Sequence, residues 1–313
     1  MINFKIYKFI FPFFLLFFFG CVNNSIKNNL IINRFENEFY NSSKDDLQLL
    51  IKKYPYLFPK QYPIEAWESF LKDSIRLAIF DKSSLVFNDF VDEKKKLLTL
   101  FLNMEENIPT FSWPKVITLN SQSEYENRII YSDSLLLISL DSFLGDTFYP
   151  DLPKYISTTM TKQHLINDVS TKILEKFARK PVDRTLLSEM IYHGKIIYLN
   201  KFFSPDEKDF IRYRSTKNKL VWANENERNI WSFFIENDFL FSTKNDLKSR
   251  FILFAPFSKF NLDIDKQSPG SIGKWLGYKI VNSYMKNNNV DVKSLLNQDY
   301  YEIFIKSKYK PKK

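Results

Sequence analysis

The spacing of apolar positions predicts helices in the first third of the chain. Between residues 32 and 104, apolar side chains recur at three- and four-residue steps, which is the spacing of one face of a helix. We expect helices over residues 32–57, with a break at Ser42 and Ser43, over 65–79, and over 85–104. Stripes of this kind are core faces far more often than ligand sites, so this region is expected to be structural.

In the middle of the chain the spacing of apolar positions changes from that of a helix to that of a strand, so a small sheet is expected there. Residues 115–120 form a short run rich in β-formers. Residues 129–140 contain two strand-like pieces around Ser132, Asp133 and Ser134, which favours a hairpin turn. The pattern therefore predicts an α+β domain that is mainly helical, with a small central sheet beside the helices.

Helical spacing returns over residues 158–176, over 184–203, and from Ser268 onward, where Pro269 is suited to the first helical turn. Asp183 is expected to cap the second of these helices, because its carboxylate can accept hydrogen bonds from free N–H groups.

Glycines in these helices predict close packing. A glycine inside a helix costs about 1 kcal/mol relative to alanine, so Gly194 indicates a neighbouring element that packs closely. Gly273 and Gly277 lie four residues apart on one face of the last helix, where another backbone could approach.

The N-terminus carries a targeting signal. Lys5 and Lys8 precede the apolar run of residues 9–19, which is typical of a secretory signal peptide. The run is shorter than the roughly 20 apolar residues of a membrane-spanning helix. Gly20 directly before Cys21, the single cysteine, resembles a bacterial lipobox, with cleavage after Gly20 and lipid attachment at Cys21. The alternative is an ordinary signal sequence or signal anchor with an incidental cysteine.

This signal sets the expected domain organisation. We expect a lipoprotein signal peptide over residues 1–20, a lipidated polar tether over 21–31, and one globular domain over 32–313. No cysteine follows residue 21, so no disulfide can stabilise the domain, and a packed core must do so. The 44% of hydrophobic and 17% of aromatic residues make a substantial core possible.

The net charge of +9 restricts the classes of partner. A basic surface favours nucleic acid or anionic lipid. The sequence has no stripe of clustered Lys and Arg with interleaved aromatic residues, and export also argues against nucleic acid. We therefore expect no nucleic-acid partner and a solvated basic surface near anionic lipid.

Candidate chemistry is sparse. The sequence has no Gly-rich phosphate loop and no GxSxG elbow, and only two histidines. A zincin helix carries two histidines four residues apart, with a glutamate beside the first as general base. Here the corresponding run is His164 to Asp168, and Leu165 stands in the place of the base. His193, followed by Gly194, could supply a third ligand.

We therefore predict no catalytic residue and no cofactor, and His164, Asp168 and His193 are only weak metal candidates. Ordinary polar roles in the interior or on the surface are the favoured interpretation. Asp141, at the end of a strand-like run, and the aromatic regions around Trp231 and Trp275 are further places for a ligand. Capping and core packing are the stronger expectations for them.

Long runs in the second half carry a family resemblance. Together with the lipobox, they resemble the gliding motility-associated lipoprotein GldB family of the Bacteroidetes: LLSEMIYHGKIIYL (186–199), VWANENERNIWSFF (221–234), RFILFAPFSKF (250–260), SPGSIGKWLGYKIVNSYM (268–285) and SKYKPKK (307–313). The resemblance implies a membrane lipoprotein linked to the gliding apparatus, which shares components with the type IX secretion system. It also implies a fold distantly similar to zincin-like metallopeptidases, with the degenerate run at His164.

Three functions are compatible with these observations. The first is a non-catalytic, lipid-anchored envelope protein of the gliding machinery that acts through protein–protein interaction. Its anchor would be in the cell membrane or outer membrane, and it would face the periplasm, because no acidic residue lies between Cys21 and Glu36. The second is a periplasmic zincin-like metallopeptidase with an unusual His/Asp/His site. The third is a lipid- or glycan-binding module that uses its aromatic surface.

Overall fold

The computed structural model describes residues 29–122 and 124–312. The chain divides into two units, Met1–Leu30 and Ile31–Lys313, and the architecture given below is that of the second unit. The predicted signal peptide and Cys21 lie outside the described residues. Within the described part of the chain, no helix is both long and apolar enough to cross a membrane. The expected single domain over residues 32–313 stays a prediction.

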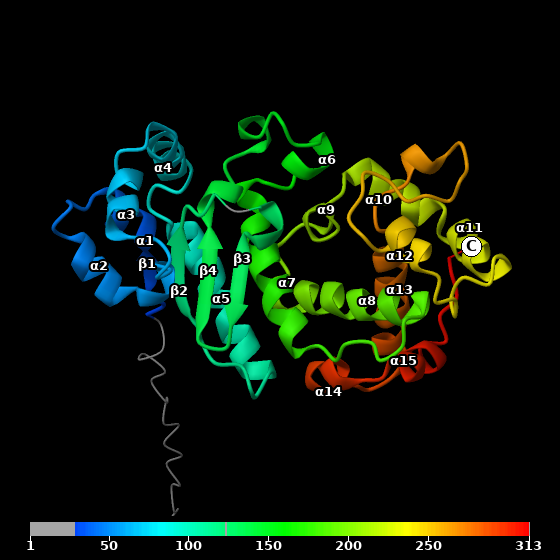
Figure 1. Cartoon of the computed structure of the whole chain (residues 1–313). Coiled ribbons are helices and arrows are strands. Elements are labelled where there is room, and N and C mark those ends of the chain that lie inside the picture. The colour runs from blue at the N-terminus through cyan, green and yellow to red at the C-terminus, as the bar shows by residue number, and fades with distance from the viewer. Residues whose placement is uncertain (1–28, 123, 313) are drawn as a thin grey trace, which may run out of the picture. The chain divides into compact units, whose positions relative to one another are not determined.

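This unit contains a mixed four-stranded sheet (Figure 1). A small sheet is what the change in the spacing of apolar positions predicts. Its strand order is β1-β2-β4-β3. β1 pairs with β2 and β2 with β4 in parallel, and β3 and β4 form the expected antiparallel hairpin. The strand bounds are β1 Ile32–Arg34, β2 Lys115–Leu119, β3 Ile129–Ser132 and β4 Leu135–Ser139.

The helix predicted over residues 32–57 is wrong at its start, because residues 32–34 form strand β1. Ile32 is in register with Val116, so the strand depends on a partner more than 80 residues away. Parallel strands need a long crossover, and helices fill this one. These helices are α1 Phe35–Tyr40, α2 Leu47–Lys53, α3 Ile64–Phe70, α4 Ser74–Val86 and α5 Val91–Asn107.

Two further helix boundaries in this region differ from the prediction. The helix expected over residues 65–79 is interrupted after Phe70, and Asp73 caps the new helix α4 by accepting a hydrogen bond of 2.9 Å from the Arg76 N–H. The helix expected from residue 85 begins at Val91, because Phe90 adopts a left-handed conformation (φ 54°). Both differences come from backbone conformations that a pattern of apolar positions does not encode.

The second half of the unit is helical and is built around α8 (Leu186–Phe203). This helix has buried residues on all sides, and its main contact is with α13 (Ile272–Asn287). The two lie next to each other in Figure 1. The other helices are α6 Lys154–Ser157, α7 Leu165–Phe177, α9 Asp209–Arg212, α10 Lys217–Glu225, α11 Glu227–Glu236, α12 Asn245–Phe251, α14 Val292–Asn297 and α15 Tyr300–Ser307.

Glycines allow the backbones of α8 and α13 to touch, which confirms the expectation for Gly194 and Gly277. A Cβ atom at Gly194 would lie 2.2 Å from the carbonyl carbon of Gly277. A Cβ atom at Gly277 would lie 1.8 Å from the carbonyl oxygen of Met190. No side chain fits at these distances, so glycine is required on both helices at this crossing.

Three predicted helix starts in this half are wrong. The helix expected over residues 158–176 begins at Leu165, after a short turn over Lys162–His164. Thr185 rather than Asp183 caps α8, because its hydroxyl accepts the hydrogen bond from the Ser188 N–H (3.2 Å). Asp183 instead accepts hydrogen bonds from the Thr185 N–H (3.1 Å) and the Tyr300 hydroxyl. The last long helix begins at Ile272 and not at Ser268, whose hydroxyl donates to the Asp265 carbonyl oxygen (2.7 Å) in the preceding turn.

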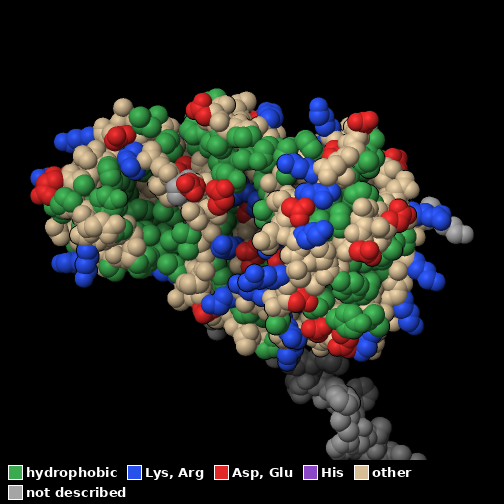
Figure 2. Space-filling model, turned by 45° about the vertical axis from the view of Figure 1, so that its right-hand side comes forward, with side chains coloured by type: hydrophobic (Ala, Val, Ile, Leu, Met, Phe, Trp, Pro, Cys, Tyr) green, Lys and Arg blue, Asp and Glu red, His purple; other side chains and the backbone are tan. Residues whose placement is uncertain are grey.

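The basic side chains do not form one continuous field on the face shown in Figure 2. They lie in several groups among apolar and uncharged polar side chains. A hollow near the middle of this face has both acidic and basic side chains at its edge. The charge on this face is therefore divided among separate clusters.

Candidate functional site

His164 and Asp168 are placed by the start of α7. A short turn over Lys162–His164 leads into the helix, and Asp168 lies in its first turn. His164 is buried, and its Nδ1 atom lies 2.9 Å from the Thr161 hydroxyl oxygen. Burial lowers the pKa of His164 to about 4, because the charged imidazolium loses solvation. The ring is therefore neutral at neutral pH.

The Asp168 carboxylate is held between two arginines. Arg214 Nη2 donates a hydrogen bond of 2.6 Å to Oδ1. Arg128 Nη2 lies 2.7 Å from Oδ2 and forms an ion pair with it, but the geometry of this contact is not that of a hydrogen bond. Burial by itself raises the pKa of Asp168, but the two guanidinium charges outweigh it and hold that pKa below its ordinary value. The carboxylate is ionised and both of its oxygens are occupied.

The two arginines come from distant parts of the chain. Arg128 directly precedes β3, its Nη1 donates to the Thr159 carbonyl oxygen (3.3 Å), and its guanidinium lies 5.1 Å from the Phe143 ring centre. Arg214 follows α9 in a left-handed conformation (φ 46°). Neither arginine is predicted from the sequence as part of a site, because a single arginine in a loop carries no recognisable pattern.

His193 lies on α8. Its Nε2 atom is 3.8 Å from the Glu189 carboxylate on the same helix, and burial lowers its pKa well below the ordinary value. No group of three or more His, Cys, Asp and Glu side chains in the described ranges is arranged to hold a metal ion. The structure therefore does not assemble His164, Asp168 and His193 into a ligand set.

Two neighbouring cavities adjoin the cluster. A cavity of about 800 Å³ is bordered by His164 and Tyr155, and a smaller one of about 150 Å³ is bordered by His193 and Lys274. Arg214 lines both. Burial, with the nearby Arg214 charge, lowers the pKa of Lys274 to about 8. Its ammonium group has no hydrogen bond or ion pair to any of the residues that the structure describes.

The other candidate residues have structural roles. The Asp141 carboxylate accepts hydrogen bonds from the Ser121 N–H (3.1 Å) and the Gln122 N–H (2.6 Å), so it stabilises the turn after β2. All five tryptophans of the chain lie among the described residues, and none of them is exposed. Trp275 is buried, and the Trp231 ring packs against that of Tyr309 (5.1 Å between centres). They do not form an exposed aromatic surface.

Taken together, the fold is a mainly helical α+β unit whose candidate site is a charge cluster in which Asp168 and Arg128 are buried and Arg214 borders two cavities. Comparison with known protein families identifies the family of the chain. The family model described as gliding motility protein GldB matches residues 21–311. The chain belongs to this family of gliding motility-associated lipoproteins, which implies attachment to a membrane of the cell envelope. Comparison with curated proteins and with solved structures gives no match.

Proposed function

We propose that this chain is a non-catalytic envelope protein of the gliding motility machinery, linked to type IX secretion, that acts by binding other proteins of that machinery. One observation carries the non-catalytic part: both oxygens of the Asp168 carboxylate are occupied by Arg128 and Arg214. A carboxylate in that state is a poor metal ligand and a poor base, because either role would require breaking a buried ion pair.

We propose that Cys21 carries the membrane anchor. Each acyl CH₂ group buried in the bilayer contributes about 0.8 kcal/mol to membrane binding, and stable attachment needs more than one acyl chain. An N-terminal cysteine that carries palmitate and further acyl groups would supply these chains. The match to the family model begins at residue 21, directly after the proposed signal peptide of residues 1–20. The anchored domain would face the periplasm from the cell membrane or the outer membrane.

The metallopeptidase alternative receives no support from the site. A zincin needs a metal-bound water and a general base beside it. Leu165 takes the place of that base, and the side chain of Leu165 is fully buried in the core. The distant zincin likeness of the fold remains part of the proposal. It comes from the family resemblance, and the run from His164 to Asp168 at the start of α7 is its degenerate counterpart.

The experiment is crosslinking in membranes of the producing cell, with a tagged wild-type chain at its natural abundance. We expect mass spectrometry to recover components of the gliding or secretion apparatus, and the Cys21→Ser variant to lose them because it is no longer held at the membrane. A wild-type chain that crosslinks to no envelope protein would contradict the proposal. So would a peptidase activity that disappears in His164→Ala.

A further inference from the structure

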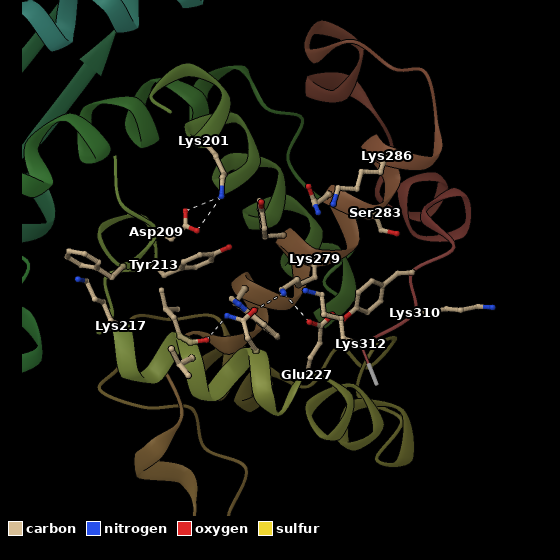
Figure 3. A pocket seen from close by; sticks show the side chains of 18 residues that line it. Lys201, Asp209, Tyr213, Lys217, Glu227, Lys279, Ser283, Lys286, Lys310 and Lys312 are labelled. Atoms are coloured by element: carbon tan, nitrogen blue, oxygen red, sulfur yellow. Dashed lines mark hydrogen bonds and ion pairs between the residues drawn. The ribbon is translucent and has the colours of Figure 1, made fainter. Parts of the chain in front are cut away.

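A lysine-rich pocket lies among α8, α9, α10, α13 and the segment after α15, apart from the Asp168 cluster (Figure 3). Its volume is about 650 Å³, which is within the range of small-molecule sites. Among the described residues that line it, two are acidic, Asp209 and Glu227, and six are lysines: Lys201, Lys217, Lys279, Lys286, Lys310 and Lys312. The charged groups of the lining therefore sum to +4.

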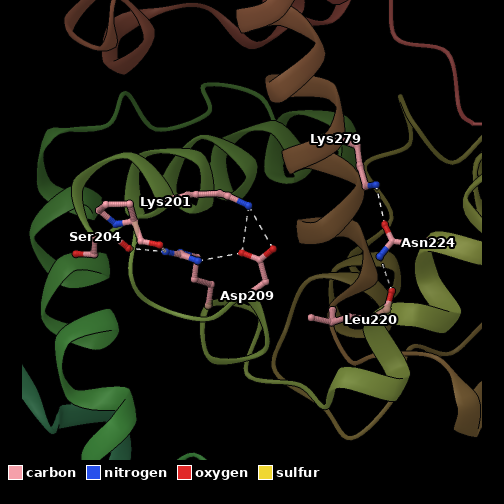
Figure 4. Close-up of polar contacts among 8 residues, drawn as sticks. Lys201, Ser204, Asp209, Leu220, Asn224 and Lys279 are labelled. Carbon is pink, nitrogen blue, oxygen red and sulfur yellow. Dashed lines mark hydrogen bonds and ion pairs between the residues drawn. The ribbon is translucent and has the colours of Figure 1, made fainter.

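Both acidic residues are already neutralised by neighbours. Lys201 Nζ lies 3.4 and 3.3 Å from the two oxygens of Asp209 (Figure 4). Lys279 Nζ donates to Glu227 Oε2 (3.0 Å) and to the Asn224 side-chain oxygen (2.8 Å). These pairs account for two of the six lysines and leave no carboxylate in the lining for the others.

The remaining lysines have no counter-charge. Within the part of the chain that the structure describes, Lys217, Lys286, Lys310 and Lys312 form no hydrogen bond or ion pair through their ammonium groups. Figure 3 shows Lys310 extending away from the pocket. Like charges that line one cavity repel one another, and a bound anion would relieve that repulsion.

Neutral groups of the lining also favour an oxyanion. The Tyr213 and Tyr278 hydroxyls and the Asn282 amide line the pocket and have no hydrogen-bond partner among the described residues. Burial raises the pKa of Tyr213 well above its ordinary value, so its hydroxyl stays protonated and can donate. The lining thus offers ammonium, hydroxyl and amide donors around a space of ligand size.

We propose that this pocket binds a phosphate-bearing ligand of small-molecule size. A phosphate monoester carries between one and two negative charges at neutral pH and presents three acceptor oxygens, which suits several free lysines better than a single carboxylate does. The ester can belong to a lipid headgroup or to a soluble molecule, and the experiment below separates these two sources. The proposal does not depend on the function proposed for the Asp168 cluster.

The test is calorimetric titration of the full chain, purified from membranes in an uncharged detergent. Glycerol 3-phosphate is the soluble probe, glycerol is its phosphate-free control, and phosphatidic acid in mixed micelles is the lipid probe. The pocket variant is Lys286→Gln/Lys312→Gln, because both lysines line this pocket and neither borders the cavities beside His164 and His193. Lys82→Gln/Lys95→Gln removes the same charge from exposed positions elsewhere.

We expect saturable binding of glycerol 3-phosphate, no binding of glycerol, and about tenfold or greater weakening in the pocket variant, since hydrogen bonds to charged groups are among the strong ones. The exposed-lysine control should bind as the wild type does. Tighter binding of phosphatidic acid than of glycerol 3-phosphate would assign the ligand to a lipid headgroup, and equal or weaker binding would assign it to a soluble ester.

A second readout does not depend on a variant. In the wild-type chain, saturating glycerol 3-phosphate should protect Lys286 from acetylation, while Lys82 continues to react, as measured by mass spectrometry. Absence of saturable binding for both phosphate probes would overturn the proposal. Equal weakening in the two double variants would also overturn it, because it would trace binding to the positive charge of the chain as a whole.

Discussion

The Asp168 carboxylate is the residue on which the buried charge cluster depends. Replacing it by asparagine leaves the Arg128 guanidinium, whose side chain is 4% exposed, without a counter-charge. Removing one partner of a buried ion pair costs about 3–5 kcal/mol. We therefore expect Asp168→Asn to lower the free energy of unfolding by that amount, measured by urea denaturation with a spectroscopic probe.

An exposed ion pair provides the matched control for this substitution. Asp133 pairs with Lys176 at 3.2 Å, and both side chains are about half exposed or more. Exposed pairs contribute about 0–1 kcal/mol, so Asp133→Asn should hardly move the urea midpoint. Similar midpoints for the two variants would show that solvent reaches Asp168.

His164 makes stability depend on pH in a defined direction. Its pKa is about 4 in the folded chain and close to 6.5 when unfolded, so between these pH values the unfolded state binds more protons. Stability is therefore present in full above pH 6.5 and falls as the pH drops toward 4. A tenfold change in proton affinity corresponds to about 1.4 kcal/mol, so the full loss is about 3 kcal/mol.

Urea titrations at several pH values test this dependence. His164→Gln cannot titrate, so its stability should decline less between pH 6.5 and pH 4 than that of the wild type. His193 also has a lowered pKa and contributes in the same direction, so the difference between wild type and variant isolates His164. Parallel pH profiles for the two proteins would mean that His164 is as accessible to protons when folded as when unfolded.

At the scale of elements, the crossing of α8 and α13 places the strictest requirement on the sequence. Alanine normally stabilises a helix by about 1 kcal/mol relative to glycine. At Gly277 the added Cβ would lie 1.8 Å from the Met190 carbonyl oxygen, so the two helices would have to separate. We expect Gly277→Ala to destabilise the protein by about 3 kcal/mol or more, through loss of core packing, measured by thermal and urea unfolding.

An exposed helical position serves as the control for this substitution. Asn218 lies on α10 and is exposed, so Asn218→Ala should leave stability within about 0.5 kcal/mol of the wild type. Gly194 and Gly277 belong to the same contact, so the double alanine variant should cost less than the sum of the two single variants. Full additivity would indicate that the helices do not meet at these residues.

Local patterns were enough to predict the elements that depend on nearby residues. The β3–β4 hairpin forms as predicted, and α8 forms where a helix was predicted although it starts two residues later, because alternation and helical spacing are properties of short segments. Strand β1 could not be predicted this way, since its three residues become a strand only by pairing with β2. The charge cluster could not be predicted for the same reason, because Arg128, Asp168 and Arg214 come together only in the folded chain.

At the scale of the whole molecule, the unit Ile31–Lys313 has its own buried core and contains no cysteine. No disulfide can then form within it. Its stability should come from the apolar side chains of the core and the crossing of α8 and α13. Attachment to the membrane and folding of the body should therefore be separable.

Cys21→Ser tests this separation, because serine cannot carry a thioether-linked lipid. We expect the variant to leave the membrane fraction, measured by fractionation and detergent phase partitioning, while the melting temperature of the purified protein stays that of the wild type. We expect folding to be unchanged because the unit Ile31–Lys313 has its own buried core. A variant that stays in the membrane would disprove attachment through Cys21, and one that leaves it but melts lower would show that the anchor takes part in the fold.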